Sequence, residues 1–227
     1  MSRVTAIFVT ATGTDIGKTF VTTGLIRHWQ AAGKTVAAIK PVASGYDPAQ
    51  AAASDPGVLA TALGRPVSET EIEKISPWRF RAPLAPDLAA AREGRSIDFN
   101  ALVEFCRQEA ARSPGTLLIE GVGGVMVALD DRHTVLDWIT MLRFPLLVVT
   151  GSYLGSMSHT LTALHVLAQR KLDIAAVVVD ESPASPVAMN DTVGTLARFT
   201  DIPIIALPRL PADVYDHAAF ESVAALL

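Results

Sequence analysis

The chain has 227 residues, half of them hydrophobic, with a net charge of -4 and an isoelectric point near 5.7. Its length supports one buried core and one domain over residues 1–227, while its weakly acidic charge favours neither nucleic-acid nor membrane-surface binding. A single cysteine excludes an internal disulfide, and the apolar runs fall well below the roughly 18 residues of a membrane span. We therefore expect a cytoplasmic protein that acts on small molecules, with no nucleic-acid or membrane partner.

Short apolar runs alternate with helical patterns along the chain. The runs have the continuous hydrophobicity of strands that are covered on both faces, and they span residues 6–10, 36–40, 116–120, 145–150, 174–180 and 203–207. Helices are predicted over 18–32, 98–112, 134–143, 156–170 and 188–199. Residues 43–97 contain six prolines and are expected to form loops and short helices. The alternation predicts an α/β fold with a doubly wound, mainly parallel sheet flanked by helices.

The stretch TATGTDIGKTF, residues 10–20, joins the first predicted strand to the first predicted helix. Gly17, Lys18 and Thr19 fit the phosphate-binding pattern G-x-x-x-x-G-K-[ST], whereas Thr12 stands where the first glycine belongs. In such a loop the backbone N–H groups face an anion, the lysine reaches the β and γ phosphates, and the threonine can ligate Mg²⁺. The placement favours a P-loop NTPase-like site over an ordinary Gly-Lys-Thr helix start.

Charged residues that end apolar runs lie at the edge of the sheet where doubly wound folds bind ligands. Lys40 ends the second run and is followed by a proline, which would hold it within reach of the loop. The alternative is an ordinary surface lysine. Glu120 ends the third run, before a glycine-rich turn, and is a candidate Mg²⁺ ligand. The alternative is a buried structural acid.

Four motifs together resemble one family over nearly the whole chain. The loop, IKPVASG at 39–45, EGVGG at 120–124 and LGSMSH at 154–159 are similar in order and spacing to the dethiobiotin synthetases, ATP-dependent ligases of biotin biosynthesis. That family's loop resembles G-T-x-T-x-x-G-K-T, which has one more residue between its glycines. Ala11 replaces the first of these glycines, and alanine is compatible with the position only if its φ is negative.

The resemblance implies a reaction and a site. Members of the family convert 7,8-diaminononanoate, CO₂ and ATP into a cyclic urea through a carbamate and its mixed anhydride with phosphate. The resemblance implies catalytic roles for Lys18 and Lys40 and Mg²⁺ ligands in Thr19, Asp55 and Glu120. Nucleotide contacts are implied at Thr14, Asp15, Ile16, Gly17, Lys18, Thr19, Phe20, Asp55, Glu120, Gly121, Val122, Gly123, Asp180, Glu181, Leu207, Pro208 and Arg209, and diamine contacts at Thr14, Ser44, Gly155, Ser156, Met157 and Ser158.

Two positions depart from the family pattern. Asp180 and Glu181 stand where the family tends to carry an asparagine for the adenine amino group. An ionised acid accepts hydrogen bonds but donates none, so the base preference stays open. A partner-subunit tyrosine that often meets the substrate carboxylate in the family falls near Thr192.

Other functions and assemblies share this fold class. A nucleotide-switch ATPase of the septum-site or chromosome-partition type would carry a second lysine at the position of Gly13. Another amine- or carboxylate-activating ligase, such as the ATP domain of the corrin-ring amidases, would normally continue into a glutamine-using domain. The resemblance also implies a homodimer with the diamine near the subunit boundary, and the broadly apolar helix 156–170 agrees with it. The alternative is a helix buried inside a monomer.

Overall fold

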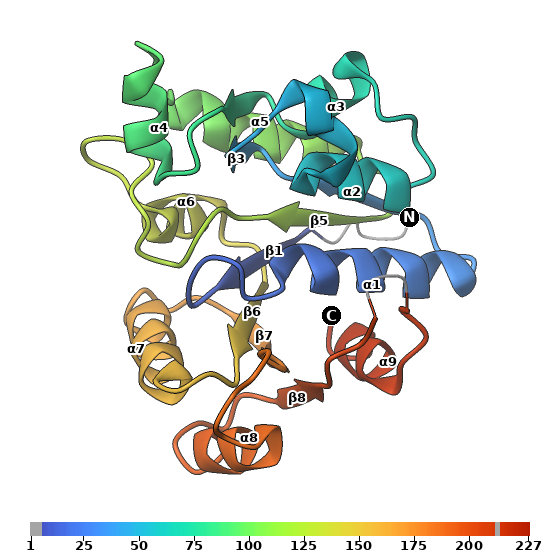
Figure 1. Ribbon diagram of the computed structural model, residues 1–227, viewed down its shortest axis with the longest axis vertical. Helices are drawn as coiled ribbons and strands as arrows, with labels where there is room; N and C mark the ends of the chain where they lie inside the picture. Colours follow the sequence, from blue (N-terminus) through green and yellow to red (C-terminus); the bar gives the residue numbers. More distant parts are fainter. Residues whose placement is uncertain (1–5, 212–213) are drawn as a thin grey trace.

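The computed structural model describes residues 6–211 and 214–227 (Figure 1). Its main sheet has six parallel strands in the order β2-β5-β1-β6-β7-β8, which confirms the predicted α/β class. All six apolar runs form strands, with ends within one residue of the predicted ones. The strands are β1 (Ala6–Ala11), β2 (Val36–Ile39), β5 (Thr116–Glu120), β6 (Leu146–Gly151), β7 (Ile174–Asp180) and β8 (Ile204–Leu207). The predicted domain also includes residues 1–5 and 212–213, which lie outside the described residues.

The order of the strands reverses beside β1. β1 pairs with β5 on one side and with β6 on the other, with Val9 opposite both Glu120 and Leu147. β2 pairs with β5 so that Ile39 lies opposite Ile119. The carboxyl ends of β1, β2 and β5 therefore meet at one edge, where the reversal opens a crevice for a ligand.

Alternating side chains of the strands give the sheet two apolar faces. Ile7 and Val9 face a core completed by α1 (Lys18–Ala31), α2 (Asp55–Ala62), α3 (Glu69–Ile75) and α9 (Ala218–Ala224). Phe8 faces a core completed by α4 (Pro86–Arg92), α5 (Phe99–Arg112), α6 (Val135–Leu142) and α7 (Ser156–Gln169). In Figure 1, α6 and α7 lie on one side of the sheet and α1 and α9 on the other. This is the double winding that the alternation predicts.

The helix predictions are confirmed with small shifts at the ends. The largest is in α8 (Met189–Leu196), which ends three residues before the predicted 188–199, because the chain turns toward β8. The helix α9 was not predicted. It is only seven residues long, and its buried side chains Ala219, Phe220 and Val223 pack against the core that contains α1.

Residues 43–97 contain more regular structure than their prolines indicate. Besides the 3-10 helix η1 (Pro48–Ala53) and the helices α2, α3 and α4, two three-residue strands form a small parallel sheet. These strands are β3 (Val42–Ser44) and β4 (Trp78–Phe80), and both were missed because three residues are too few for a period to be recognised. β3 follows directly after Lys40 and Pro41, and it carries Ser44 toward the edge of the main sheet.

The helix α7 is only partly covered within the chain. Leu164 and Leu167 are buried, whereas Met157, Leu161 and Val166 are half-buried. Leu154, in the turn before the helix, is 75% exposed. Val166 packs against the core, whereas Met157 and Leu161 lie one turn apart and form the outward strip of the helix. Among the described residues, none of the helices has the length and apolar character to cross a membrane.

Candidate active site

The loop between β1 and α1 has the backbone of an anion-binding loop. Gly17 is the N-cap of α1 and has a left-handed conformation, with φ of 86°. Asp15 is also left-handed, with φ of 54°, which is uncommon for a residue with a side chain. No side chain caps α1, so the first N–H groups of the helix are left for a ligand. Ala11 is the last residue of β1 and is not among the described residues with positive φ, so it fits its position as expected.

Lys18 ties the loop to the turn that follows β5. Its Nζ donates hydrogen bonds to the carbonyl oxygens of Gly13, at 3.0 Å, and Gly123, at 2.9 Å. Burial, with a smaller contribution from the positive charge of Lys40, lowers the pKa of Lys18 to about 8. An anion in the loop would stabilise the charged form of this lysine.

Lys40 lies at the centre of a charged cluster. Its Nζ is 2.7 Å from Oε1 of Glu120 and 2.9 Å from Oδ2 of Asp55. Burial alone would lower the pKa of Lys40, but the two carboxylates outweigh it and hold the pKa above its usual value. The same Oε1 of Glu120 accepts a hydrogen bond from the hydroxyl of Thr19 at 2.7 Å. Because Lys40 is 3% exposed and Glu120 fully buried, the surface-lysine alternative does not hold.

The cluster has a donor set that fits Mg²⁺. The other carboxylate oxygen of Glu120, Oε2, is buried and has no hydrogen-bond partner among the described residues. The Thr19 hydroxyl and the half-exposed carboxylate of Asp55 lie beside the same glutamate and lysine. Two carboxylates and a hydroxyl form a partial set of hard oxygen ligands, which Mg²⁺ usually completes with phosphate oxygens and water. The pKa of Asp55 lies below its usual value, because Lys40 outweighs the effect of burial.

Two adjoining hollows contain most of the residues that the resemblance implies. The first, which we call the loop pocket, has a volume of about 290 Å³ and is lined by Thr14, Asp15, Ile16, Gly17, Lys18, Thr19, Phe20, Lys40, Ser44, Asp55, Val122 and Gly123. The second, which we call the side pocket, has a volume of about 440 Å³ and is lined by Asp15, Ile16, Gly17, Phe20, Asp180, Glu181, Ser182, Pro183, Arg209 and Leu210. The shared stretch of the loop makes the two hollows parts of one site.

The side pocket lies between the turns after β7 and β8. The backbone N–H of Glu181 donates to the carbonyl of Leu207 at 2.9 Å, and its carboxylate accepts from the N–H of Arg209 at 2.9 Å. Burial raises the pKa of Asp180 to about 6, with Arg209 opposing the rise and Glu181 adding to it. Sequence reasoning missed Ser182, Pro183 and Leu210, although all three follow strands at the carboxyl edge. Tyr215 lines a separate hollow and meets the side pocket only through Phe20, whose ring lies 5.2 Å from its own.

Other expected site residues line neither hollow. Glu120 and Gly121 accept hydrogen bonds from Lys40, which lines the loop pocket. Leu207 accepts a hydrogen bond from Glu181, which lines the side pocket, and Pro208 follows it in the chain. The residues expected to contact the diamine, Gly155, Ser156, Met157 and Ser158, lie at the start of α7.

The start of α7 resembles that of α1. Gly155 is a left-handed N-cap with φ of 98° and no side-chain cap, and the buried hydroxyl of Ser156 has no partner among the described residues. Thr192 is fully buried in α8, so it does not take the place of the partner-subunit tyrosine.

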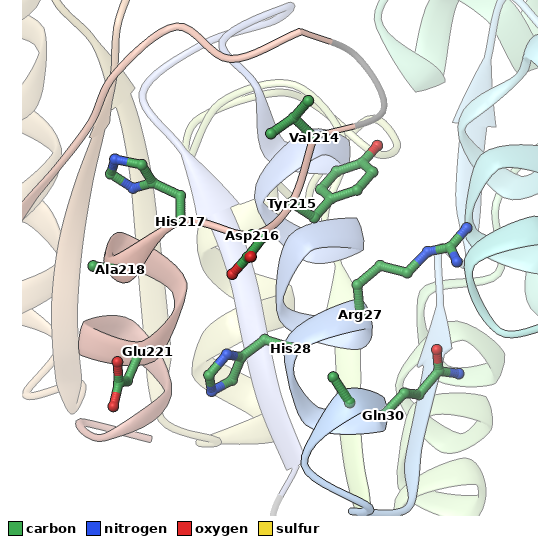
Figure 2. A pocket seen from close by; sticks show the side chains of 10 residues that line it. Arg27, His28, Gln30, Val214, Tyr215, Asp216, His217, Ala218 and Glu221 are labelled. Atoms are coloured by element: carbon green, nitrogen blue, oxygen red, sulfur yellow. The ribbon is translucent and has the colours of Figure 1, made fainter.

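A wider hollow lies away from the loop. It has a volume of about 960 Å³ and separates the second half of α1 from the segment that leads into α9. Figure 2 shows Arg27 and His28 projecting from α1, and Asp216 and His217 on the opposite segment. None of the expected site residues lines this hollow, and it has no glycine-rich loop. We therefore do not assign the nucleotide site to this hollow, although its volume exceeds that of the loop pocket and the side pocket.

The parallel sheet, its reversal beside β1 and the Gly-Lys-Thr loop at that point define a P-loop NTPase-like protein. A family model described as an AAA domain matches residues 5–213. The chain is 50% identical to the ATP-dependent dethiobiotin synthetase of Acidiphilium cryptum, over 84% of this chain and 86% of that protein. It is 45% identical to the enzyme of the same name from Methylobacterium nodulans, over 94% and 98%. The chain belongs to the ATP-dependent dethiobiotin synthetase family.

More distant solved structures share the fold alone. The MinC:MinD cell division complex of Aquifex aeolicus contains a chain that matches with a TM-score of 0.54 at 13% identity, over 92% of this chain and 83% of that one. The signal recognition particle receptor FtsY of Elizabethkingia anophelis, in complex with GDP, matches with a TM-score of 0.55 at 13% identity, over 100% and 64%. The likeness to the cell division complex therefore concerns the fold alone, whereas the sequence identity assigns the chain to the synthetase family.

Proposed function

We propose that this protein is an ATP- and Mg²⁺-dependent ligase that converts 7,8-diaminononanoate and CO₂ into dethiobiotin in biotin biosynthesis. The observation that carries the proposal is the convergence of two buried lysines, Lys18 and Lys40, on a pocket built by a phosphate-binding loop. Identity of 45–50% to synthetases of this name, over most of each chain, supports the same reaction. We further propose that the reaction takes place in the cytoplasm, without a nucleic-acid or membrane partner.

The reaction divides into three balanced steps. One amine of the substrate attacks CO₂ and loses a proton, which gives a carbamate. A carbamate oxygen then attacks the γ-phosphorus of ATP, the bond to the β-phosphate oxygen breaks, and ADP leaves. Finally the second amine attacks the carbamoyl carbon, phosphate leaves with the bonding electrons, and the amine loses a proton as the five-membered urea closes. Such a sequence needs positioning and neutralisation of charge more than covalent help from the protein.

Both lysines suit the phosphoryl step. Lys18 is held at the start of α1 by two carbonyl groups, at the position where loop lysines meet the β and γ phosphates. Lys40 keeps its positive charge firmly, because Glu120 and Asp55 lie against it, and it would balance the charge of the carbamate and the transferring phosphoryl group. Thr19, Asp55 and Glu120 would hold Mg²⁺, which in such sites neutralises phosphate charge and orients the transferring group.

We propose that the diamine extends from the loop pocket toward α7. Thr14 and Ser44 line the pocket wall and would contact the reacting amines. The substrate carboxylate would bind at Gly155 to Ser158, because the start of α7 carries free N–H groups and the positive end of a helix dipole.

We also propose that the working unit is a homodimer with the diamine near the subunit boundary. The outward strip of α7 and the exposed Leu154 support this, since they leave apolar surface next to the carboxylate position.

A direct assay tests the proposed reaction. The protein is incubated with the diamine, bicarbonate, Mg²⁺ and ATP, and the cyclic urea is followed by mass spectrometry together with ADP and phosphate. We expect one urea for each ADP, and no urea when the diamine, bicarbonate or ATP is left out. A steady rate of ATP hydrolysis that is the same with and without the diamine, with no urea formed, would contradict the proposal and favour a nucleotide-switch ATPase.

A further inference from the structure

The side pocket contains a carboxylate without a partner. Asp180 ends β7, and none of the described residues donates a hydrogen bond to its side chain. The carboxylate lies directly against the phosphate loop, because a Cβ added to Gly17 would come within 1.9 Å of its Oδ2. Because no described protein donor occupies its oxygens, this half-buried carboxylate is free to accept hydrogen bonds from a ligand in the side pocket.

The position of the side pocket indicates which part of a nucleotide enters it. If phosphates bind at the start of α1, the nucleoside must leave the loop through a hollow that shares its residues. The side pocket shares Asp15, Ile16, Gly17 and Phe20 with the loop pocket, and its volume of about 440 Å³ has room for a base. The wall beyond the shared loop carries Asp180. This step rests on the proposed function, because it takes the loop to be a nucleotide site.

Base edges differ in what they offer an acid. An ionised carboxylate has two acceptor oxygens and no donor. Guanine presents two neighbouring donors, the ring N1–H and the 2-amino group, and so can donate to both oxygens. Adenine presents one donor, the 6-amino group, next to the acceptor N1. A protonated carboxyl group matches that second pattern, because its O–H donates to N1 while its carbonyl oxygen accepts from the amino group.

We propose that Asp180 sets the base preference of this enzyme: the ionised form accepts a guanine edge, the protonated form accepts an adenine edge, and the protein therefore uses GTP as well as ATP. A paired, two-point contact of this kind discriminates between bases by roughly tenfold or more. The preference for the guanine nucleotide rises with pH as Asp180 loses its proton.

The charges around Asp180 set the pH at which the change occurs. Glu181, on the same turn, and Asp15, on the loop, are acidic, while Arg209 faces Asp180 from the turn after β8. Burial raises the pKa of Asp180 to about 6, and the guanidinium of Arg209 limits the rise. The negative charge of a bound triphosphate acts in the same direction as Glu181 and moves the transition upward.

Binding of nonhydrolysable nucleotides tests this directly. The dissociation constants of the imido analogues of ATP and GTP are measured by calorimetry with Mg²⁺, at about pH 5 and about pH 8, on either side of the Asp180 transition. Because both analogues carry the same triphosphate group, the effect of pH on that group cancels in the ratio of their dissociation constants. We expect the GTP analogue to bind at least as tightly as the ATP analogue at the higher pH, and its relative affinity to fall by about tenfold at the lower pH.

Two variants separate the role of Asp180 from a general effect of charge. Asp180→Asn places an amide donor beside an acceptor, so it should favour the ATP analogue by about tenfold at both pH values and remove the pH dependence. Asp173→Asn makes the same change at an exposed position just before β7, at the opposite end of the strand from Asp180, and should leave the ratio as in the wild type.

The outcomes distinguish the base preference from the proposed function. If the ratio of the two dissociation constants changes neither with pH nor in Asp180→Asn, and the protein still makes the cyclic urea with ATP, the base preference alone is overturned. Equal weakening of both analogues by Asp180→Asn would also overturn it, because it would assign the residue a structural role. Failure of both analogues to bind the wild type would overturn this inference together with the proposed function.

Discussion

Replacing Glu120 by glutamine tests the charged cluster most directly. The change removes one charge from a fully buried carboxylate while Lys40, 3% exposed, stays buried beside it. Breaking a buried ion pair usually costs about 3–5 kcal/mol, because the remaining charge is left without compensation. Here Asp55 remains 2.9 Å from the Lys40 ammonium, and the glutamine oxygen can still accept a hydrogen bond. We therefore expect a loss of about 2–3 kcal/mol in the free energy of unfolding, somewhat below that range.

For a chain of this length, such a loss lowers the melting temperature by about 5–10 °C, which calorimetry of the nucleotide-free protein measures. If Glu120 also holds Mg²⁺, the variant should need a higher Mg²⁺ concentration for half-maximal formation of the cyclic urea. Glu104→Gln, at an exposed position of α5, is the matched control and should change neither quantity. An unchanged melting temperature would refute the energetic reasoning about the pair. A lowered melting temperature with unchanged Mg²⁺ dependence would leave Glu120 as a buried structural acid.

Three other predictions follow from single positions. Lys18→Ala should leave the protein folded, by circular dichroism, and lower turnover by about 10² to 10³, so a folded variant with near-normal turnover would count against the site. Leu161→Glu, on the outward strip of α7, should give a folded monomer by light scattering with weakened diamine binding, whereas Leu164→Glu, at a buried position, should unfold the chain. A wild-type protein that is monomeric and still forms the cyclic urea would refute the shared site. Asp137→Ala, which removes the Asp137 half of the capping box with Thr134, should cost about 1 kcal/mol in the free energy of unfolding, measured at neutral pH with urea as the denaturant. Hydrogen bonds from Thr134 outweigh burial and hold the pKa of Asp137 below its usual value, so this cost should shrink as acid protonates the wild type; a cost that stays constant would argue against the cap.

The sequence alone determined the main elements and the loop. A strand buried on both faces needs a nearly continuous apolar run, and a helix needs apolar residues with a period of 3.6. Both patterns can be recognised within a short stretch of sequence. The loop is equally local, since Gly17, Lys18 and Thr19 are neighbours in sequence and act together at one helix start. Lys40 and Glu120 could also be assigned to the edge of the sheet from local sequence, because each is the last residue of an apolar run and is charged.

Only the tertiary structure decided which of these residues meet. Lys40 and Glu120 are 80 positions apart, and they pair because β2 lies next to β5, which no period in the sequence encodes. Asp180 lies against Gly17 for a similar reason, through the placement of β7 beyond β6 in the same sheet. The small sheet of β3 and β4 and the contact of Tyr215 with Phe20 are also long-range, and their segments are too short for a local signal. Local propensity sets which elements form, whereas the burial of two apolar faces of one sheet sets their order, and that order brings the charges of the site together.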